Sequence, residues 1–157
     1  MYAVLVAVLP AIASAMDNEP SEFLGIQYGA SIDKYQGDLK QIAEDGDSSH
    51  YRRLTDRPFF GGVEVRRISY QFYKGSFASG MYVTVGARDL KSILAHLTSH
   101  YGEPNTTNPR HRIYAWEGEH SGVIVSCDIS TTCYTEFFDK ALRAQAAAAQ
   151  GKDKDDD

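Results

Sequence analysis

Residues 62–85 read GVEVRRISYQFYKGSFASGMYVTV, and this stretch decides the fold. The dipeptide Lys74-Gly75 separates two runs of alternating apolar residues, which predicts a β-hairpin with a two-residue loop. With that loop, apolar side chains of the two strands meet on one face of the hairpin. The expected pairs are Phe72 opposite Phe77, Tyr70 opposite Ser79 and Ile68 opposite Met81.

Before Ile68 the alternation of apolar residues shifts by one position, because the next apolar residues are Val65 and Val63. One extra residue at Arg66-Arg67, a β-bulge, restores the match. We therefore predict that Val65 lies against Val83 and Val63 against Val85, since a shift of one residue would turn the apolar set toward water.

A helix is predicted directly after the hairpin, over residues 89–101. Gly102 follows as a left-handed helix end, and Pro104 prevents the helix from continuing. The apolar side chains share one helical stripe, which we expect to lie on the hairpin. They are Leu90, Ile93, Leu94, Leu97 and Tyr101.

The fold class follows from the order of the remaining elements. The patterns predict helices over 32–44 and 139–150, and strands over 50–54, 112–116, 122–128 and 132–137. Tight connections between strands favour antiparallel pairing. We predict an α+β fold, with an antiparallel sheet of about five to six strands and helices packed on one face.

The first fifteen residues, MYAVLVAVLPAIASA, carry no charge and end in Ala13-Ser14-Ala15, a pattern typical of a signal-peptidase site. The run is too short for a permanent membrane anchor. We expect residues 1–15 to be a signal peptide with a weak or shortened start, since the usual basic residues are missing. The alternative is a buried N-terminal strand or helix. The expected division is then a flexible lead-in over 16–22, one α+β domain over 23–145, and an Ala-rich end with an acidic tail over 146–157.

Export would place the two cysteines in an oxidising compartment, where they can form a disulfide. A three-residue loop at residues 129–131 would place Cys127 directly opposite Cys133 across a hairpin. In an oxidising compartment we predict a disulfide, with two reduced core thiols as the alternative. The C-x5-C spacing is typical neither of zinc sites nor of redox-active C-x-x-C motifs. The protein is accordingly expected to be periplasmic or secreted, with no integral membrane segment after cleavage.

The net charge of −5 argues against a nucleic-acid partner, which usually requires a basic protein. Arginine is nevertheless clustered around the start of the hairpin. If the strand at 50–54 pairs beside the hairpin, five guanidinium groups gather at one end and are suited to a carboxylate or phosphate. They belong to Arg52, Arg53, Arg57, Arg66 and Arg67. The alternative is that they pair with nearby acids or only solvate the sheet.

Catalytic signatures are absent from the sequence: it contains no G-x-S-x-G, H-E-x-x-H or P-loop motif. His96 and His100 stand four residues apart on the predicted helix but lack a third metal ligand in the pattern. We therefore expect no enzyme activity, no cofactor and no metal site. The alternative is a small envelope enzyme or enzyme inhibitor whose site lies in the loop at residues 117–121.

Several short motifs together resemble small exported bacterial proteins of uncharacterised function. They are G-I-x-Y-G-x-S at 25–31, F-G-G-V-x-V at 60–65, Y-x-F-Y-x-G-x-F at 70–77, Y-G-x-P at 101–104 and Y-x-W-x-G at 114–118. The resemblance implies a module of the bacterial envelope that binds another molecule, and the absence of catalytic motifs predicts that this module is non-catalytic. Its expected partner is an envelope protein or a small anionic ligand.

Overall fold

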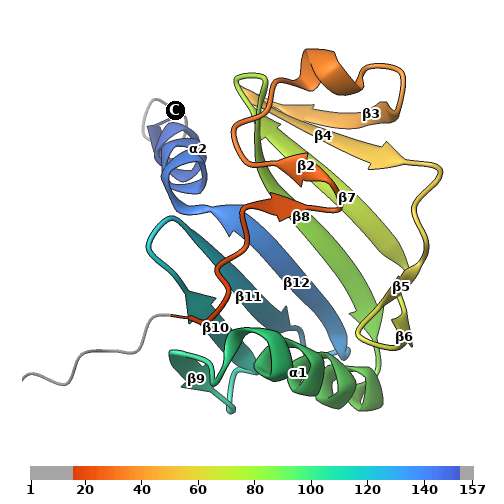
Figure 1. The fold of residues 1–157 in the computed structure, drawn as a ribbon, viewed down its shortest axis with the longest axis vertical. Coiled ribbons are helices and arrows are strands. Elements are labelled where there is room, and N and C mark those ends of the chain that lie inside the picture. The colour runs from red at the N-terminus through yellow and green to blue at the C-terminus, as the bar shows by residue number, and fades with distance from the viewer. Residues whose placement is uncertain (1–15, 153–157) are drawn as a thin grey trace, which may run out of the picture.

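The structure, a computed structural model, describes residues 16–152 and is built on one antiparallel sheet of eight strands, in the order β3-β4-β7-β8-β12-β11-β10-β9 (Figure 1). The α+β class is confirmed, and the sheet is larger than the five to six strands predicted. Its strands are β3 (Leu39–Asp45), β4 (Ser48–Arg53), β7 (Arg67–Tyr73), β8 (Ser76–Val85), β9 (Thr106–Asn108), β10 (Ile113–Glu117), β11 (Ser121–Cys127) and β12 (Thr132–Asp139).

Shorter elements decorate the sheet. Two small two-stranded sheets lie outside it, β1 (Glu22–Phe23) with β2 (Ile26–Gln27), and β5 (Phe59–Phe60) with β6 (Val63–Glu64). The helices are η1 (Ile32–Tyr35), α1 (Ala87–Tyr101) and α2 (Lys140–Lys152). In the described part of the chain, no helix is long and apolar enough to cross a membrane.

The central hairpin β7–β8 forms with the predicted two-residue loop, in which Lys74 and Gly75 both have positive φ. Phe72 pairs with Phe77 as expected. The predicted pairs further from the loop are wrong by one residue, because the bulge lies next to the loop and leaves Ala78 unpaired. Consequently Tyr70 is opposite Gly80 and Ile68 is opposite Tyr82, while the expected bulge at Arg66-Arg67 does not form.

The predicted helix over 32–44 is also wrong. Only the single 3-10 turn η1 forms, and residues 39–45 become strand β3 at the edge of the sheet. Asp45 pairs with Ser48 across the turn Gly46-Asp47. Backbone pairing with β4 therefore outweighs an apolar helical spacing that Gly37 already weakened.

The main core lies on one face of the sheet, where α1 buries Ile93 and Leu97 completely. This helix ends as predicted: Gly102 has φ 78° and donates its backbone N–H to the carbonyl of Thr98 at 3.0 Å. Trp116 is fully buried in the same core and donates its indole N–H to the Gly102 carbonyl at 2.8 Å. The prediction that this helix packs on the apolar face of the hairpin is confirmed for β8, which α1 contacts together with β6.

The second helix, α2, packs on the other face of the sheet, so the prediction of helices on one face is wrong. Neighbouring residues of β7 and β8 point to opposite faces: Phe72 and Phe77 enter the main core, whereas Tyr73 and Ala78 contact α2. Ala146 of α2 is only 6% exposed against them. The start of the Ala-rich end thus covers the bulge of β8.

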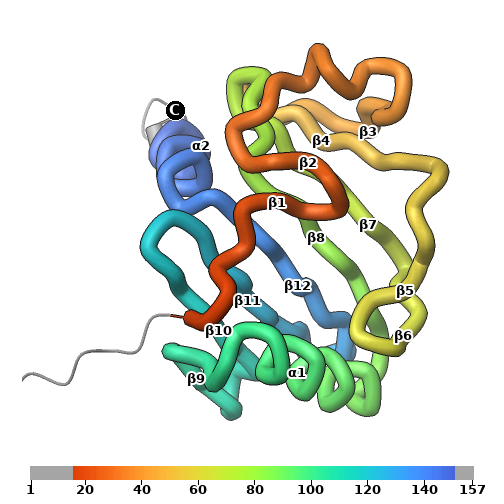
Figure 2. The backbone as a smooth tube through the Cα atoms, viewed as in Figure 1, coloured from red at the N-terminus to blue at the C-terminus, as the bar shows by residue number. Residues whose placement is uncertain are grey.

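Residues 16–22, expected to be a flexible lead-in, are held against the body of the protein. The chain passes beside β10 and α1 before it reaches β1 (Figure 2). Met16 is buried in the main core, and Asp17 donates its backbone N–H to the Tyr101 carbonyl at 3.0 Å. The predicted signal peptide at 1–15 and the acidic residues after Lys152 lie outside the described residues.

The cysteine hairpin is confirmed. Cys127 pairs with Cys133 across β11 and β12, and a disulfide joins them. The Asp128 carboxylate stabilises the turn, because it accepts hydrogen bonds from the backbone N–H groups of Ser130 and Thr132 and from the Ser130 hydroxyl. Hydrogen bonding to Ser130 is the main cause of a lowered pKa at Asp128.

Candidate functional site

Four of the five predicted arginines gather around one open cavity of about 430 Å³ at the end of β4 and β7. We call this cavity the arginine pocket. Arg57 does not line it. The residues that do are Ile42, Arg52, Arg53, Leu54, Asp56, Pro58, Val65, Arg66, Arg67 and Ile68.

Strand pairing explains why these arginines meet. Because β4 and β7 are antiparallel, the last residues of β4, Arg52 and Arg53, lie beside the first residues of β7. Arg66 is fixed just before β7, where its backbone N–H donates to the Val83 carbonyl at 2.7 Å. The pairing of the short strand beside the hairpin, on which the prediction depended, is therefore observed.

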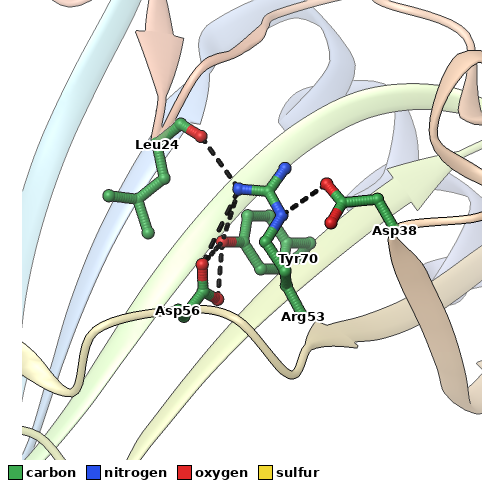
Figure 3. A network of polar contacts seen from close by, with 5 residues as sticks. All are labelled: Leu24, Asp38, Arg53, Asp56 and Tyr70. Atoms are coloured by element: carbon green, nitrogen blue, oxygen red, sulfur yellow. Dashed lines mark hydrogen bonds and ion pairs between the residues drawn. The ribbon is translucent and has the colours of Figure 1, made fainter.

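Arg53 is the centre of a polar network (Figure 3). Its Nε lies 2.7 Å from a carboxylate oxygen of Asp38, and its Nη1 lies 3.7 Å from Asp56. The same Nη1 donates to the backbone carbonyl of Leu24 at 3.0 Å. The Arg53 side chain is only 15% exposed, so it forms part of the wall of the pocket.

Tyr70 belongs to the same network and contacts both Asp56 and Arg53. Its hydroxyl donates to the Asp56 carboxylate, with 2.7 and 2.8 Å to the two oxygens, and its ring lies 5.2 Å from the Arg53 guanidinium carbon. Burial, followed by the hydrogen bond to Asp56, raises the pKa of Tyr70. The phenol therefore stays protonated and keeps donating to Asp56 over the physiological range.

The other three guanidinium groups of the pocket, those of Arg52, Arg66 and Arg67, are exposed. Within residues 16–152 none of them has a side-chain hydrogen bond or ion pair. Glu64 and Asp89 line a second hollow beside Arg66 without pairing with it. Asp38 and Asp56 lie against Arg53, so the four arginines and two aspartates leave a net charge of +2 at the pocket, and this charge is carried by the three exposed arginines.

Sequence reasoning missed the apolar part of the pocket. Ile42 was assigned to a helix, and Leu54 directly follows Arg53 at the end of β4. Both are large exposed apolar side chains, 47% exposed for Ile42 and 76% for Leu54. The position of Leu54 beside two arginines is the one signal in the sequence that points to this apolar rim.

The two helix histidines have structural contacts. The His100 Nδ1 lies 2.9 Å from the His96 carbonyl oxygen, and the His96 ring packs against Phe60. Burial, followed by the nearby His100, lowers the pKa of His96. Among the described residues, no group of three or more His, Cys, Asp or Glu side chains is placed to hold a metal ion.

The loop at residues 117–121, the alternative site, binds a carboxylate from the chain itself. Glu19 accepts hydrogen bonds from the backbone N–H groups of Glu119, His120 and Ser121. Gly118 allows this approach, since a Cβ there would lie 2.3 Å from the Glu19 carboxyl carbon. A substrate or partner carboxylate would first have to displace Glu19 from these donors.

Glu19→Gln is expected to destabilise the protein by about 1 kcal/mol at neutral pH, because a charged acceptor of three N–H groups is lost. Burial raises the pKa of Glu19, but the hydrogen bonds outweigh it and hold the pKa below its usual 4.5. A lowered folded pKa gives stability that is present above pH 4.5 and lost as pH falls through the folded value. Urea unfolding of both proteins should therefore converge at acidic pH; a constant difference would contradict this role.

Comparison of the chain with protein-family models, with curated proteins and with solved structures finds no match. The function of the protein is therefore inferred from its own residues and their geometry.

Proposed function

We propose that the protein is an exported, non-catalytic binding module of the bacterial envelope that binds an anionic group in the arginine pocket. The observation that carries this proposal is the convergence of three unpaired guanidinium groups, from Arg52, Arg66 and Arg67, on one cavity. Guanidinium groups match the geometry of carboxylates and phosphates, and charge-assisted hydrogen bonds are among the strongest in proteins.

The carboxylate that lines the pocket is already engaged, which supports binding over catalysis. Asp56 is the carboxylate among its lining residues, and both of its oxygens accept from the Tyr70 hydroxyl while Arg53 lies beside it. A general base needs a carboxylate that is available to a substrate proton. The lining of the pocket thus offers positive charge and apolar surface, which are features of a recognition site.

The proposed location, periplasmic or secreted, draws on two features. The disulfide between Cys127 and Cys133 is typical of oxidising compartments. The uncharged first fifteen residues ending in Ala13-Ser14-Ala15 fit an export signal. The partner would then be an envelope protein or a small ligand that carries the anionic group, and the acidic net charge disfavours nucleic acid.

The double variant Arg66→Ala/Arg67→Ala is expected to weaken binding of inorganic phosphate at least tenfold. Each lost charge-assisted hydrogen bond costs about 1.5–3 kcal/mol, and about 1.4 kcal/mol corresponds to a factor of ten. Backbone amide shifts in NMR titrations measure the affinity and place it at residues 52–54 and 65–68. The urea midpoint should stay unchanged, because both side chains are exposed.

The matched control is Arg88→Ala/Arg110→Ala, which removes the same two charges from exposed positions outside the pocket. This control should bind phosphate like the original protein. If phosphate binding weakened equally in both double variants, the effect would come from the net charge of the protein and not from the pocket. No shift in the original protein at any phosphate concentration would overturn the proposed anion site.

A further inference from the structure

We propose that the ligand of the arginine pocket is a single-chain anionic amphiphile, whose head group binds the guanidinium groups and whose alkyl chain lies on Ile42 and Leu54. This inference rests on the proposed function and specifies its ligand. It starts from the coincidence, in one cavity, of three unpaired arginines with two strongly exposed aliphatic side chains.

The exposure of Ile42 has a defined structural cause. In the pairing of β3 with β4, Gln41 lies opposite Tyr51 and Ala43 lies opposite His50, so Ile42 is the extra residue of a bulge. Bulges re-aim a side chain and are frequent next to binding sites. Here the bulge places Ile42 among the lining residues of the pocket.

The position of Leu54 is defined by its neighbour in the sequence. It directly follows Arg53, which is held by Asp38, Asp56 and the Leu24 carbonyl (Figure 3). The side chain nevertheless stays 76% exposed. Leu54 and Ile42 thus form an exposed apolar patch bordered by guanidinium groups, which is the pattern of a binding surface.

The combination of guanidinium groups with exposed aliphatic side chains indicates the class of ligand. A small polar anion would use the three guanidinium groups and leave Ile42 and Leu54 in water. An alkyl chain attached to the anion would cover them, and each methylene that is fully removed from water strengthens binding by up to about fourfold. The cavity of about 430 Å³ falls within the range of about 300–1,000 Å³ that is usual for small-molecule sites.

The test is a series of alkyl phosphates, from ethyl to octyl, titrated by calorimetry below their micelle concentrations. The affinity of the original protein should rise at least tenfold from ethyl to octyl phosphate. In Ile42→Ser/Leu54→Ser the affinity for octyl phosphate should fall to the level of ethyl phosphate, which itself should bind unchanged. In Arg66→Ala/Arg67→Ala all members of the series should weaken together.

The matched control is Ile129→Ser, which removes a fully exposed aliphatic side chain in the β11–β12 turn, outside the pocket. It should keep the full dependence on chain length. Both positions altered in the test variant are exposed, and an unchanged thermal midpoint would verify that the variant folds.

The possible failures are distinguishable. Equal affinity for all chain lengths would overturn the amphiphile and leave the anion site standing, whereas absence of binding by both inorganic and alkyl phosphates would remove both. A chain-length dependence that survives in Ile42→Ser/Leu54→Ser would place the alkyl chain elsewhere. Arginine-dependent sedimentation with phosphatidylglycerol vesicles, without binding of soluble alkyl phosphates, would replace the single amphiphile by a membrane surface.

Discussion

Gly80→Ala is expected to lower the free energy of unfolding by about 3 kcal/mol, because the new methyl group has no room in the core. A Cβ at this position would lie 1.9 Å from Cδ1 of Phe23. The Phe23 ring cannot move aside easily, since it packs between Tyr70, Tyr82 and Phe137 at centroid distances of 5.0–5.6 Å. Urea unfolding measures the loss.

A double-mutant cycle isolates the contact. Phe23→Ala alone should cost about 3–5 kcal/mol, the usual range for a buried phenylalanine. In that background Gly80→Ala should become nearly neutral, because the ring that opposes the methyl group is gone. Gly37→Ala is the control, since no atom lies within 4 Å of its added Cβ. Equal losses from Gly80→Ala in both backgrounds would contradict the explanation.

The same contact explains why the hairpin was predicted with the right loop and the wrong register. The dipeptide Lys74-Gly75 fixes the turn locally, so Phe72 and Phe77 pair as expected. The rest of the register depends on distant segments: Phe23 fills the space over Gly80, and Ala146 packs on the bulge residue Ala78. Neither neighbour can be recognised from the alternation within the hairpin.

Strand β3 shows a second limit of pattern reasoning. Ile32, Tyr35, Leu39 and Ile42 have helical spacing, yet the structure uses them in three different ways. Ile32 and Tyr35 pack against the core from η1, Leu39 is buried at the start of β3, and Ile42 lies in the pocket. Helix α1 was predictable because its apolar stripe agrees with the helix-end signals Gly102 and Pro104, whereas β3 is an edge strand defined by its partner β4.

The clustering of arginines at the pocket was predictable from the sequence, whereas the ion pairs of Arg53 and the apolar lining were not. The proximity of Arg52 and Arg53 to Arg66 and Arg67 follows from antiparallel pairing of neighbouring segments. The ion pairs of Arg53 with Asp38 and Asp56 could not be predicted from the sequence, because Asp38 belongs to a segment that was predicted to be helical. It also hides Ile42, whose position depends on a bulge in that same segment.

Asp56→Ala is expected to lower the free energy of unfolding by about 3 kcal/mol. The Asp56 side chain is only 10% exposed, and its loss leaves the Tyr70 hydroxyl without its acceptor and Arg53 with less compensation. Asp47→Ala is the matched control, because it removes an exposed ion pair with Lys74 and should cost less than about 1 kcal/mol. Similar losses in both variants would contradict a buried network at Asp56.

Asp56→Asn separates the hydrogen bond from the charge. The amide oxygen can still accept from Tyr70, while the negative charge next to Arg53 is lost, so we expect about half of the loss seen for alanine. The Arg53 charge would then be less compensated at the edge of the pocket. Phosphate should therefore bind Asp56→Asn more tightly than the original protein, provided that unfolding shows the variant to be folded. Weaker binding would mean that Asp56 positions the pocket more than it limits its charge.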